Sequence, residues 1–131
     1  MSEDIRFIQR FSNFKKAVNQ LEAFIEKENI NKFEVLGLLH CFEYTFELAW
    51  KTMKDYLENE GFEVNSPREA IQTAFQIELI TDGHVWIDVL NKRDLIANTY
   101  DQNKVSEAEE LINYKYYPAI KACLEQLENI I

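Results

Sequence analysis

Hydrophobic residues recur along most of the chain at intervals of three and four, which places them on one face of an α-helix. A first stripe predicts a long helix, and a second predicts another that begins at Asn31 and ends at Gly61. Asn31 stands three residues before Glu34, as in a capping box, and glycine readily closes a helix. The first stripe is Phe11, Phe14, Val18, Leu21 and Ile25; the second is Val35, Leu38, Leu39, Phe42, Phe46, Ala49, Met53 and Leu57.

The second half of the chain predicts shorter helices. Ser66-Pro67-Arg68-Glu69 is a clear start signal, with a serine cap, a proline in the first turn and a closing glutamate. The helix that follows is expected to stop near Asp82-Gly83, with Ile71, Ala74, Phe75 and Leu79 facing inward. A fourth helix is expected to carry Trp86, Leu90, Arg93, Ala97 and Tyr100 on one stripe.

A last helix is expected from about Asn103 to the end, capped by Asp101 and kinked at Pro118, whose ring removes a backbone hydrogen bond. Its core candidates are Val105, Ala108, Leu111, Leu124 and Leu127. The short connections between elements favour an all-α fold, an antiparallel up-and-down bundle of four to five helices. We expect one domain over residues 1–131.

Composition narrows the class of protein. The 131 residues include only 3 Gly and 2 Pro, too few for a β-sandwich or barrel. No apolar run approaches the roughly 18–20 residues that a membrane span needs, and residues 1–10 lack the apolar centre of a signal peptide. Cys41 and Cys123 form no C-x-x-C pair, which fits a reducing compartment. We therefore expect a cytoplasmic protein without a membrane partner.

Charge and missing motifs exclude several functions. A net charge of −9 disfavours broad nucleic-acid binding, which needs a basic face. The chain has no phosphate-cradling glycine loop, no Asp-x-Asp pair and no zinc-ligand spacing, so we expect neither a metal nor a cofactor. His40 and His84 are interpreted as ordinary helix residues. Glu43, Glu47 and Lys51 share one helix face, either as a solvated charge ladder or as part of a cleft that binds a cation or substrate.

The second predicted helix carries more aromatic side chains than its core stripe can hold. Phe42 and Phe46 lie on that stripe, and packing explains them better than base stacking does. Tyr44 and Trp50 lie off the stripe. Large aromatics outside a core often mark a subunit interface, so we expect these two residues, Trp50 with its neighbour Lys51, at a cleft or an interface.

Two longer motifs resemble a known family. They are FEYTFELAWKTMKDYL at residues 42–57 and KRDLIANTYD at residues 92–101, with the Ser66 box between them. Together they resemble the HEPN-type nucleotidyltransferase substrate-binding proteins, the HepT-like helical components of toxin–antitoxin pairs. The similarity runs from about Phe11 to about Tyr117. It implies a helical bundle that forms a homodimer and binds a minimal nucleotidyltransferase encoded nearby.

The resemblance also implies site residues. In active HEPN ribonucleases an arginine is followed, after four residues, by a histidine, and a tyrosine comes two residues later. Two copies meet at the dimer interface and cleave RNA without a metal, and the partner can adenylylate the tyrosine. Here Arg93 and Tyr100 match the motif, whereas Asn98 replaces the histidine and Asp94 replaces a common asparagine. The resemblance therefore assigns substrate binding to these four residues and makes Tyr100 the modification acceptor.

The two replacements change the chemistry that the site can perform. The Arg93 guanidinium can grip a phosphate through parallel hydrogen bonds. The Asn98 amide cannot shuttle a proton, and the Asp94 charge opposes a bound phosphate. We therefore predict a binding subunit for nucleotide or RNA with a degenerate ribonuclease motif. The alternatives are an active ribonuclease toxin that recruits His40 or His84 across the dimer, and a dimeric scaffold without nucleotide contact.

Helix geometry restricts this site further. In a continuous helix Arg93 and Asn98 would project about 140° apart. Both can address one ligand only if the helix ends or bends between them, or if a second subunit completes the site. Alternatively, Arg93 pairs with a structural carboxylate, for which Asp94, Glu43 and Glu47 are the candidates.

Overall fold

The computed structural model describes residues 2–131, and within them it consists of helices joined by short loops, which confirms the all-α class. Its buried hydrophobic residues form a single cluster. The elements are α1 (Ser2–Glu26), α2 (Lys32–Asn59), α3 (Pro67–Gln76), α4 (Gly83–Asn91), α5 (Arg93–Ala97), α6 (Gln102–Leu111), a π-helical stretch η1 (Ile112–Tyr116) and α7 (Tyr117–Ile130).

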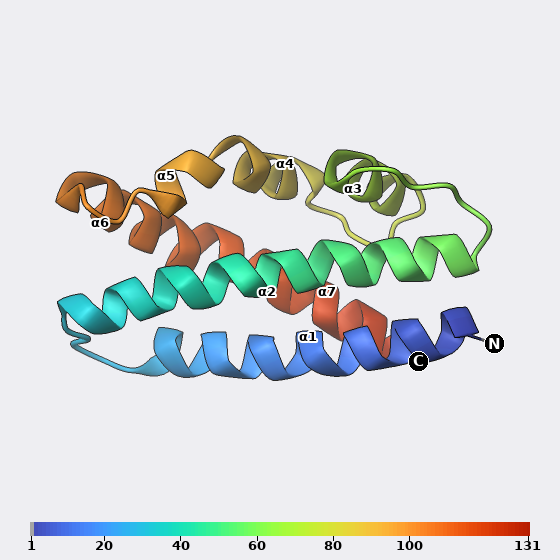
Figure 1. Cartoon of the computed structure of the whole chain (residues 1–131), viewed down its shortest axis with the longest axis horizontal. Coiled ribbons are helices and arrows are strands. Elements are labelled where there is room, and N and C mark those ends of the chain that lie inside the picture. The colour runs from blue at the N-terminus through green and yellow to red at the C-terminus, as the bar shows by residue number, and fades with distance from the viewer. Residues whose placement is uncertain (1) are drawn as a thin grey trace.

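The two longest helices form an antiparallel hairpin (Figure 1). The complete capping box fixes the start of α2, because Asn31 accepts from the Glu34 backbone N–H at 2.9 Å and Glu34 accepts in return from that of Asn31. The short helices α3, α4 and α5 run along α2 on the side away from α1 (Figure 1). The α6–η1–α7 rod crosses behind and reaches α1. Helix α2 therefore lies at the centre of the bundle.

Most residues of the predicted core stripes are buried or half-buried, but Phe75, Ala97 and Tyr100 are exposed. Phe14, Val18 and Leu21 are fully buried, and so is the α2 stripe from Leu38 to Leu57. Phe75 was expected to face inward but is 52% exposed. Helix α3 ends at Gln76, earlier than expected, and the Phe75 ring lies over Gly83, where an added Cβ would stand 3.1 Å from it. The phenyl ring therefore covers the start of α4 rather than filling the core.

The prediction of one continuous fourth helix through Tyr100 is wrong. Helix α4 ends at Asn91 and α5 ends at Ala97, after which the Asn98 N–H donates to the Leu95 carbonyl at 3.2 Å in a tight turn. The Asp101 carboxylate then accepts the backbone N–H groups of Asn103 and Lys104 and starts α6, as predicted. Tyr100 lies in the loop between these elements and is 90% exposed, so it does not belong to a core-facing stripe.

The irregularity in the last helix near Pro118 is a π-helical stretch rather than a kink. The sequence predicts a kink there, whereas the structure places the π-helical stretch η1 one turn earlier. In it the Tyr117 N–H donates to the carbonyl of Ile112, five residues back. Pro118 then occupies the first turn of α7, where its missing N–H is tolerated. The wider π-helical turn accommodates the proline, and Ile112 and Tyr116 within it are fully buried.

None of the helices in residues 2–131 combines the length and the apolar character that crossing a bilayer requires.

Candidate functional site

A cleft of about 280 Å³ opens where α2 passes α4 and α5. Its floor is apolar and its rim is charged. The lining residues are Phe42, Glu43, Phe46 and Glu47 of α2, Val89 of α4, and Arg93, Asp94, Ile96 and Ala97 of α5. The structure thus brings together four residues that the sequence had singled out in two separate groups, Glu43 with Glu47 and Arg93 with Asp94.

Arg93 begins α5 and lies at the surface of this cleft. Its Nη2 donates to Glu47 Oε1 at 2.9 Å, and 44% of each of these two side chains is exposed. The guanidinium also lies over the Phe46 ring, with Cζ 5.6 Å from the ring centroid, a cation–π arrangement. Of the carboxylates that the sequence offered to Arg93, Glu47 is therefore its partner. An exposed pair of this kind contributes about 0–1 kcal/mol to stability.

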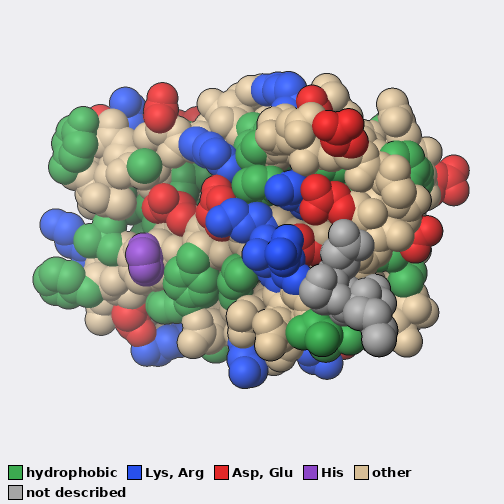
Figure 2. All heavy atoms as spheres, turned by 45° about the vertical axis from the view of Figure 1, so that its right-hand side comes forward, with side chains coloured by type: hydrophobic (Ala, Val, Ile, Leu, Met, Phe, Trp, Pro, Cys, Tyr) green, Lys and Arg blue, Asp and Glu red, His purple; other side chains and the backbone are tan. Residues whose placement is uncertain are grey.

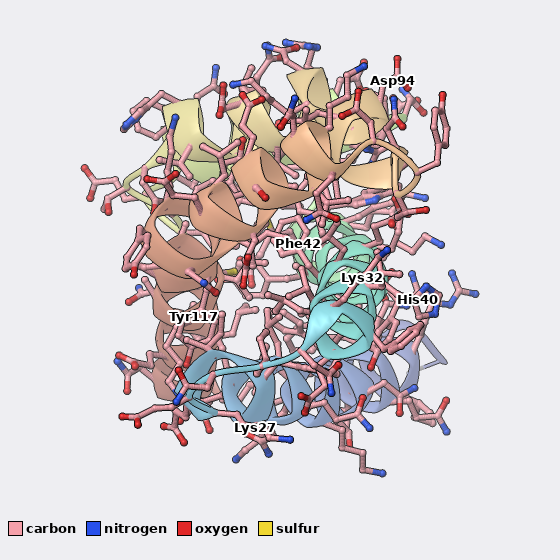
Figure 3. The ribbon with its side chains drawn as sticks, turned by 90° about the vertical axis from the view of Figure 1, so that its left-hand side faces the viewer. Lys27, Lys32, His40, Phe42, Asp94 and Tyr117 are labelled. Carbon is pink, nitrogen blue, oxygen red and sulfur yellow. The ribbon has the colours of Figure 1, made fainter. Side chains whose placement is uncertain are left out.

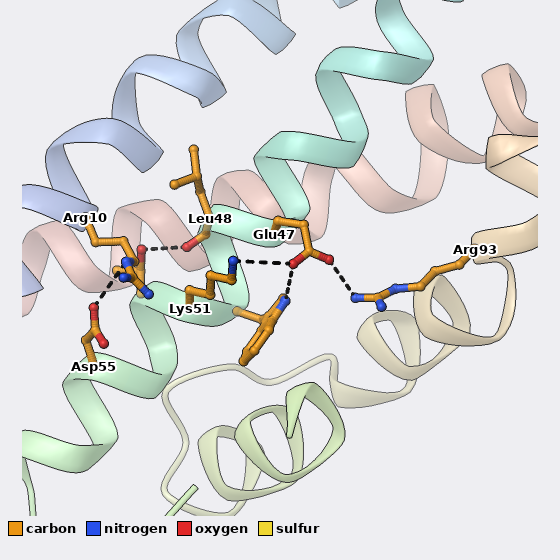
Figure 4. A network of polar contacts seen from close by, with 8 residues as sticks. Arg10, Glu47, Leu48, Lys51, Asp55 and Arg93 are labelled. Atoms are coloured by element: carbon orange, nitrogen blue, oxygen red, sulfur yellow. Dashed lines mark hydrogen bonds and ion pairs between the residues drawn. The ribbon is translucent and has the colours of Figure 1, made fainter. Parts of the chain in front are cut away.

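Three side chains converge on Glu47 (Figure 4). Besides Arg93, the Trp50 indole Nε1 donates to Glu47 Oε2 at 3.0 Å, and Lys51 Nζ lies 4.0 Å from the same oxygen. Trp50 and Lys51 follow Glu47 on α2 by three and four residues, so helical geometry alone brings them to it. Trp50 is half-buried, and its polar edge holds this carboxylate.

The residues at the end of the motif lie apart from this cleft. In the described part of the chain, neither Asn98 nor Tyr100 is among the cleft-lining residues. Asn98 follows α5 directly, and its Oδ1 is buried without a hydrogen-bond partner among the described residues. Because α5 ends at Ala97, the projection of a continuous helix does not apply to residues 98–100.

A second carboxylate fixes the joint between α4 and α5. Asp88 accepts from the hydroxyl of the buried Tyr116 at 2.6 Å, from Lys115 Nζ at 3.1 Å and from Lys92 Nζ at 3.3 Å. The Tyr116 hydrogen bond, with help from the two lysines, holds the pKa of Asp88 below its ordinary value. Sequence reasoning missed this cluster. The i,i+4 spacing of Asp88 and Lys92 was a local signal, but nothing local indicates that Tyr116 packs here.

A shallower groove of about 540 Å³ runs between α1 and α2, away from Arg93. Phe24, Gly37 and Tyr44 line it, and His40 lies at its outer side (Figure 3). Tyr44 was expected at an interface; it is half-buried, and its hydroxyl donates to Gln20. The hydrophobic pattern alone did not indicate this groove.

The charged surface is mixed rather than basic. On the face in Figure 2, acidic and basic side chains lie interspersed across the middle of the molecule. His40 and His84 are both exposed. Among the side chains that the structure describes, residues 5–131, no three histidine, cysteine or carboxylate groups come together as they would around a metal ion. The cleft can offer a planar cation, an aromatic face and an apolar floor to a small anionic ligand.

Comparison with known proteins places this geometry in context. The model of a family described as nucleotidyltransferase substrate binding protein like matches residues 9–129. A Haemophilus influenzae protein named "Probable ribonuclease HepT" is 27% identical over 75 residues, which cover 53% of this chain. The match spans 51% of that relative, about half of its length.

Two solved structures share the fold. A crystal structure from Thermus thermophilus matches with a TM-score of 0.74 and 27% identity, covering 89% of this chain and 97% of that one. A Haemophilus influenzae structure matches with a TM-score of 0.68 and 22% identity, covering 93% of this chain and 96% of that one. The latter was described as revealing the fold of a substrate binding domain of a nucleotidyltransferase.

Proposed function

The chain belongs to the family of nucleotidyltransferase substrate binding protein like proteins, and on that premise we propose that it is the helical substrate-binding subunit of a two-component nucleotidyltransferase system. In this proposal it binds a nucleotide or an RNA phosphate at the cleft between α2 and α5. A minimal nucleotidyltransferase supplies the nucleotide chemistry, and the subunit acts as a homodimer.

The observation that carries the proposal is the position of Arg93. Its guanidinium lies at the mouth of an apolar cleft, over an aromatic ring, and is 44% exposed. A guanidinium has five N–H donors in a planar fork, and the hydrogen bond to Glu47 uses one of them. Arginine held in this way suits bidentate recognition of a phosphate. The cleft volume of about 280 Å³ suits a ligand the size of one nucleotide unit better than a long polymer.

Binding without turnover fits the motif that begins at Arg93 and the charges of the cleft. Proton transfer by a positioned side chain is typically worth about 10²–10⁴ in rate, and the Asn98 amide cannot supply it. Asp94 and Glu43 add negative charge to the same cleft. This charge weakens phosphate binding and favours a ligand that also uses the apolar floor, such as a nucleotide with its base.

The family and the charge both support the proposed partner. A chain with a net charge of −9 is suited to a basic protein surface. Tyr100, 90% exposed in the loop after α5, is accessible to a second protein, and we propose it as the acceptor if the partner adenylylates this subunit.

A second candidate is a ribonuclease toxin, which the name of the Haemophilus influenzae relative suggests. That relative aligns over only about half of its length. Cleavage would require a titratable group in place of Asn98, for which the exposed His40 and His84 of a second subunit are the candidates. The substitution at position 98 favours the binding function over this one.

The experiment that tests the proposal measures RNA affinity by fluorescence anisotropy with a labelled ten-nucleotide single-stranded RNA at fixed salt. We expect Arg93→Ala to weaken binding about tenfold or more, because charge-assisted hydrogen bonds are worth about 1.5–3 kcal/mol. Arg68→Ala is the matched control, since Arg68 is an exposed arginine of α3 outside the cleft. Equal affinities for the two variants would reject the cleft as the binding site.

A further inference from the structure

One N–H donor of the Arg93 guanidinium is already bonded to an anionic group of the same chain. Glu47 Oε1 accepts from Arg93 Nη2 at 2.9 Å, at the mouth of the cleft where a phosphate would bind. A carboxylate presents two oxygens and one negative charge to a guanidinium, much as one edge of a phosphate does. Any anion that binds Arg93 through this edge must therefore displace Glu47 from it.

The rest of the Glu47 environment makes this displacement inexpensive. Its other oxygen, Oε2, accepts from Trp50 Nε1 at 3.0 Å and lies 4.0 Å from Lys51 Nζ. Both groups belong to α2, as Glu47 does, so their contacts with Glu47 do not depend on Arg93. After Arg93 has turned to a ligand, Glu47 still has a hydrogen bond and a nearby cation. Because both side chains are 44% exposed, water can also solvate them during the exchange.

We infer that Glu47 is an internal competitor for the anion site: a positioning residue that holds Arg93 at the cleft and yields it only to a stronger anionic ligand. The inference rests on the proposed function, since it concerns the same cleft. It assigns Glu47 the role of setting the affinity threshold of the site. The competition would lower the affinity of every anion that binds Arg93 through this edge, and a nucleotide phosphate with its base bound on the apolar floor would overcome it.

A neighbouring residue separates this role from a general effect of charge. Glu43 lies one helical turn before Glu47 on α2 and lines the same cleft. Within residues 2–131, the ion pair of Arg93 is with Glu47 and not with Glu43. Glu43→Gln therefore removes the same charge from the same cleft without touching the competing contact.

The test compares the affinity for the labelled ten-nucleotide RNA among the wild type, Glu47→Gln, Glu43→Gln and Arg93→Ala. We expect Glu47→Gln to bind about fivefold more tightly than Glu43→Gln, the size that an exposed ion pair of up to about 1 kcal/mol corresponds to. We also expect the gain to vanish in Glu47→Gln combined with Arg93→Ala, because the competition acts through Arg93.

The outcomes distinguish the inference from the proposed function. If Glu47→Gln and Glu43→Gln tighten binding equally, or if Glu47→Gln weakens it, Glu47 is not a competitor although the cleft still binds RNA. If Glu47→Gln keeps its gain in the Arg93→Ala background, the contact is irrelevant and the inference is overturned. If Arg93→Ala binds RNA as the wild type does, the proposed function fails, and the inference fails with it.

Discussion

Asn98 follows α5 directly, at the position where the family resemblance expects a histidine. An imidazole has a pKa near neutrality and can accept and return a proton, whereas an amide can only form hydrogen bonds. The Asn98 Oδ1 is buried and has no partner among the described residues, which is a costly arrangement for a purely structural side chain. Under the proposed function, the amide at this position leaves the subunit able to bind but without proton transfer.

We predict that Asn98→His gains ribonuclease activity and that the wild type cleaves RNA little above the uncatalysed background. The imidazole restores proton transfer, so the gain should approach about 10²-fold and depend on pH near neutrality. A time course of RNA cleavage on denaturing gels measures it. Asn98→Ala is the control and should stay inactive. Brisk cleavage by the wild type would contradict the binding function and support the ribonuclease alternative.

At the scale of the elements, an ion pair links α1 to α2. Its carboxylate is buried, whereas the carboxylate of the Arg93–Glu47 pair is partly exposed. Asp55 of α2 is buried, and its Oδ2 lies 3.4 Å from Arg10 Nε of α1 (Figure 4). Desolvation raises the pKa of Asp55 above its ordinary value, although Arg10 and Arg6 oppose the change. The electrostatic attraction of the two arginines is therefore smaller than the free-energy cost of desolvating the charged carboxylate.

We predict that Asp55→Asn raises the free energy of unfolding at pH 7, because the neutral amide avoids this desolvation cost. A raised pKa means that the folded state binds the proton more tightly than the unfolded state does. The wild type should therefore gain stability relative to the variant as the pH falls from 7 toward the ordinary pKa of 3.8. Urea denaturation at several pH values measures both effects.

Asp88→Asn is the matched control for this prediction. The pKa of Asp88 is lowered, chiefly by the Tyr116 hydrogen bond, so its carboxylate stabilises the fold above the unfolded pKa. That contribution is lost as the pH falls through the folded value, and the variant should be less stable than the wild type at pH 7. A large loss of stability in Asp55→Asn would show that its ion pair stabilises the fold after all.

Local signals predicted the starts of α2, α3 and α6. Asn31, Ser66 and Asp101 all cap helices as their spacing indicated. The break between α4 and α5 was missed, and the contact between Tyr116 and Asp88 beside it joins residues that are far apart in the sequence. The sequence identified both pairs of charged residues that line the cleft, Glu43 with Glu47 and Arg93 with Asp94. It did not indicate that the two pairs lie together, because that depends on how α5 packs on α2.

For the molecule as a whole, the proposed binding cleft lies on one face of the central helix α2. Its other sides pack against α1, α3 and α7, and the cleft opens on the side that α5 leaves accessible. Acidic and basic side chains lie interspersed on the surface in Figure 2, and the net charge is −9. This distribution favours a compact ligand at one arginine, with a basic protein as partner, over a long nucleic acid.

The central claim is that the cleft around Arg93 binds the nucleotide, and chemical-shift mapping with an isotope-labelled chain tests it most directly. Adenosine monophosphate and the ten-nucleotide RNA are titrated separately. We predict that the Arg93 Nε–Hε and Trp50 Nε1–H resonances shift together, since both side chains contact Glu47. Shifts confined to the groove between α1 and α2, around His40, with Arg93 and Trp50 unchanged, would contradict the account.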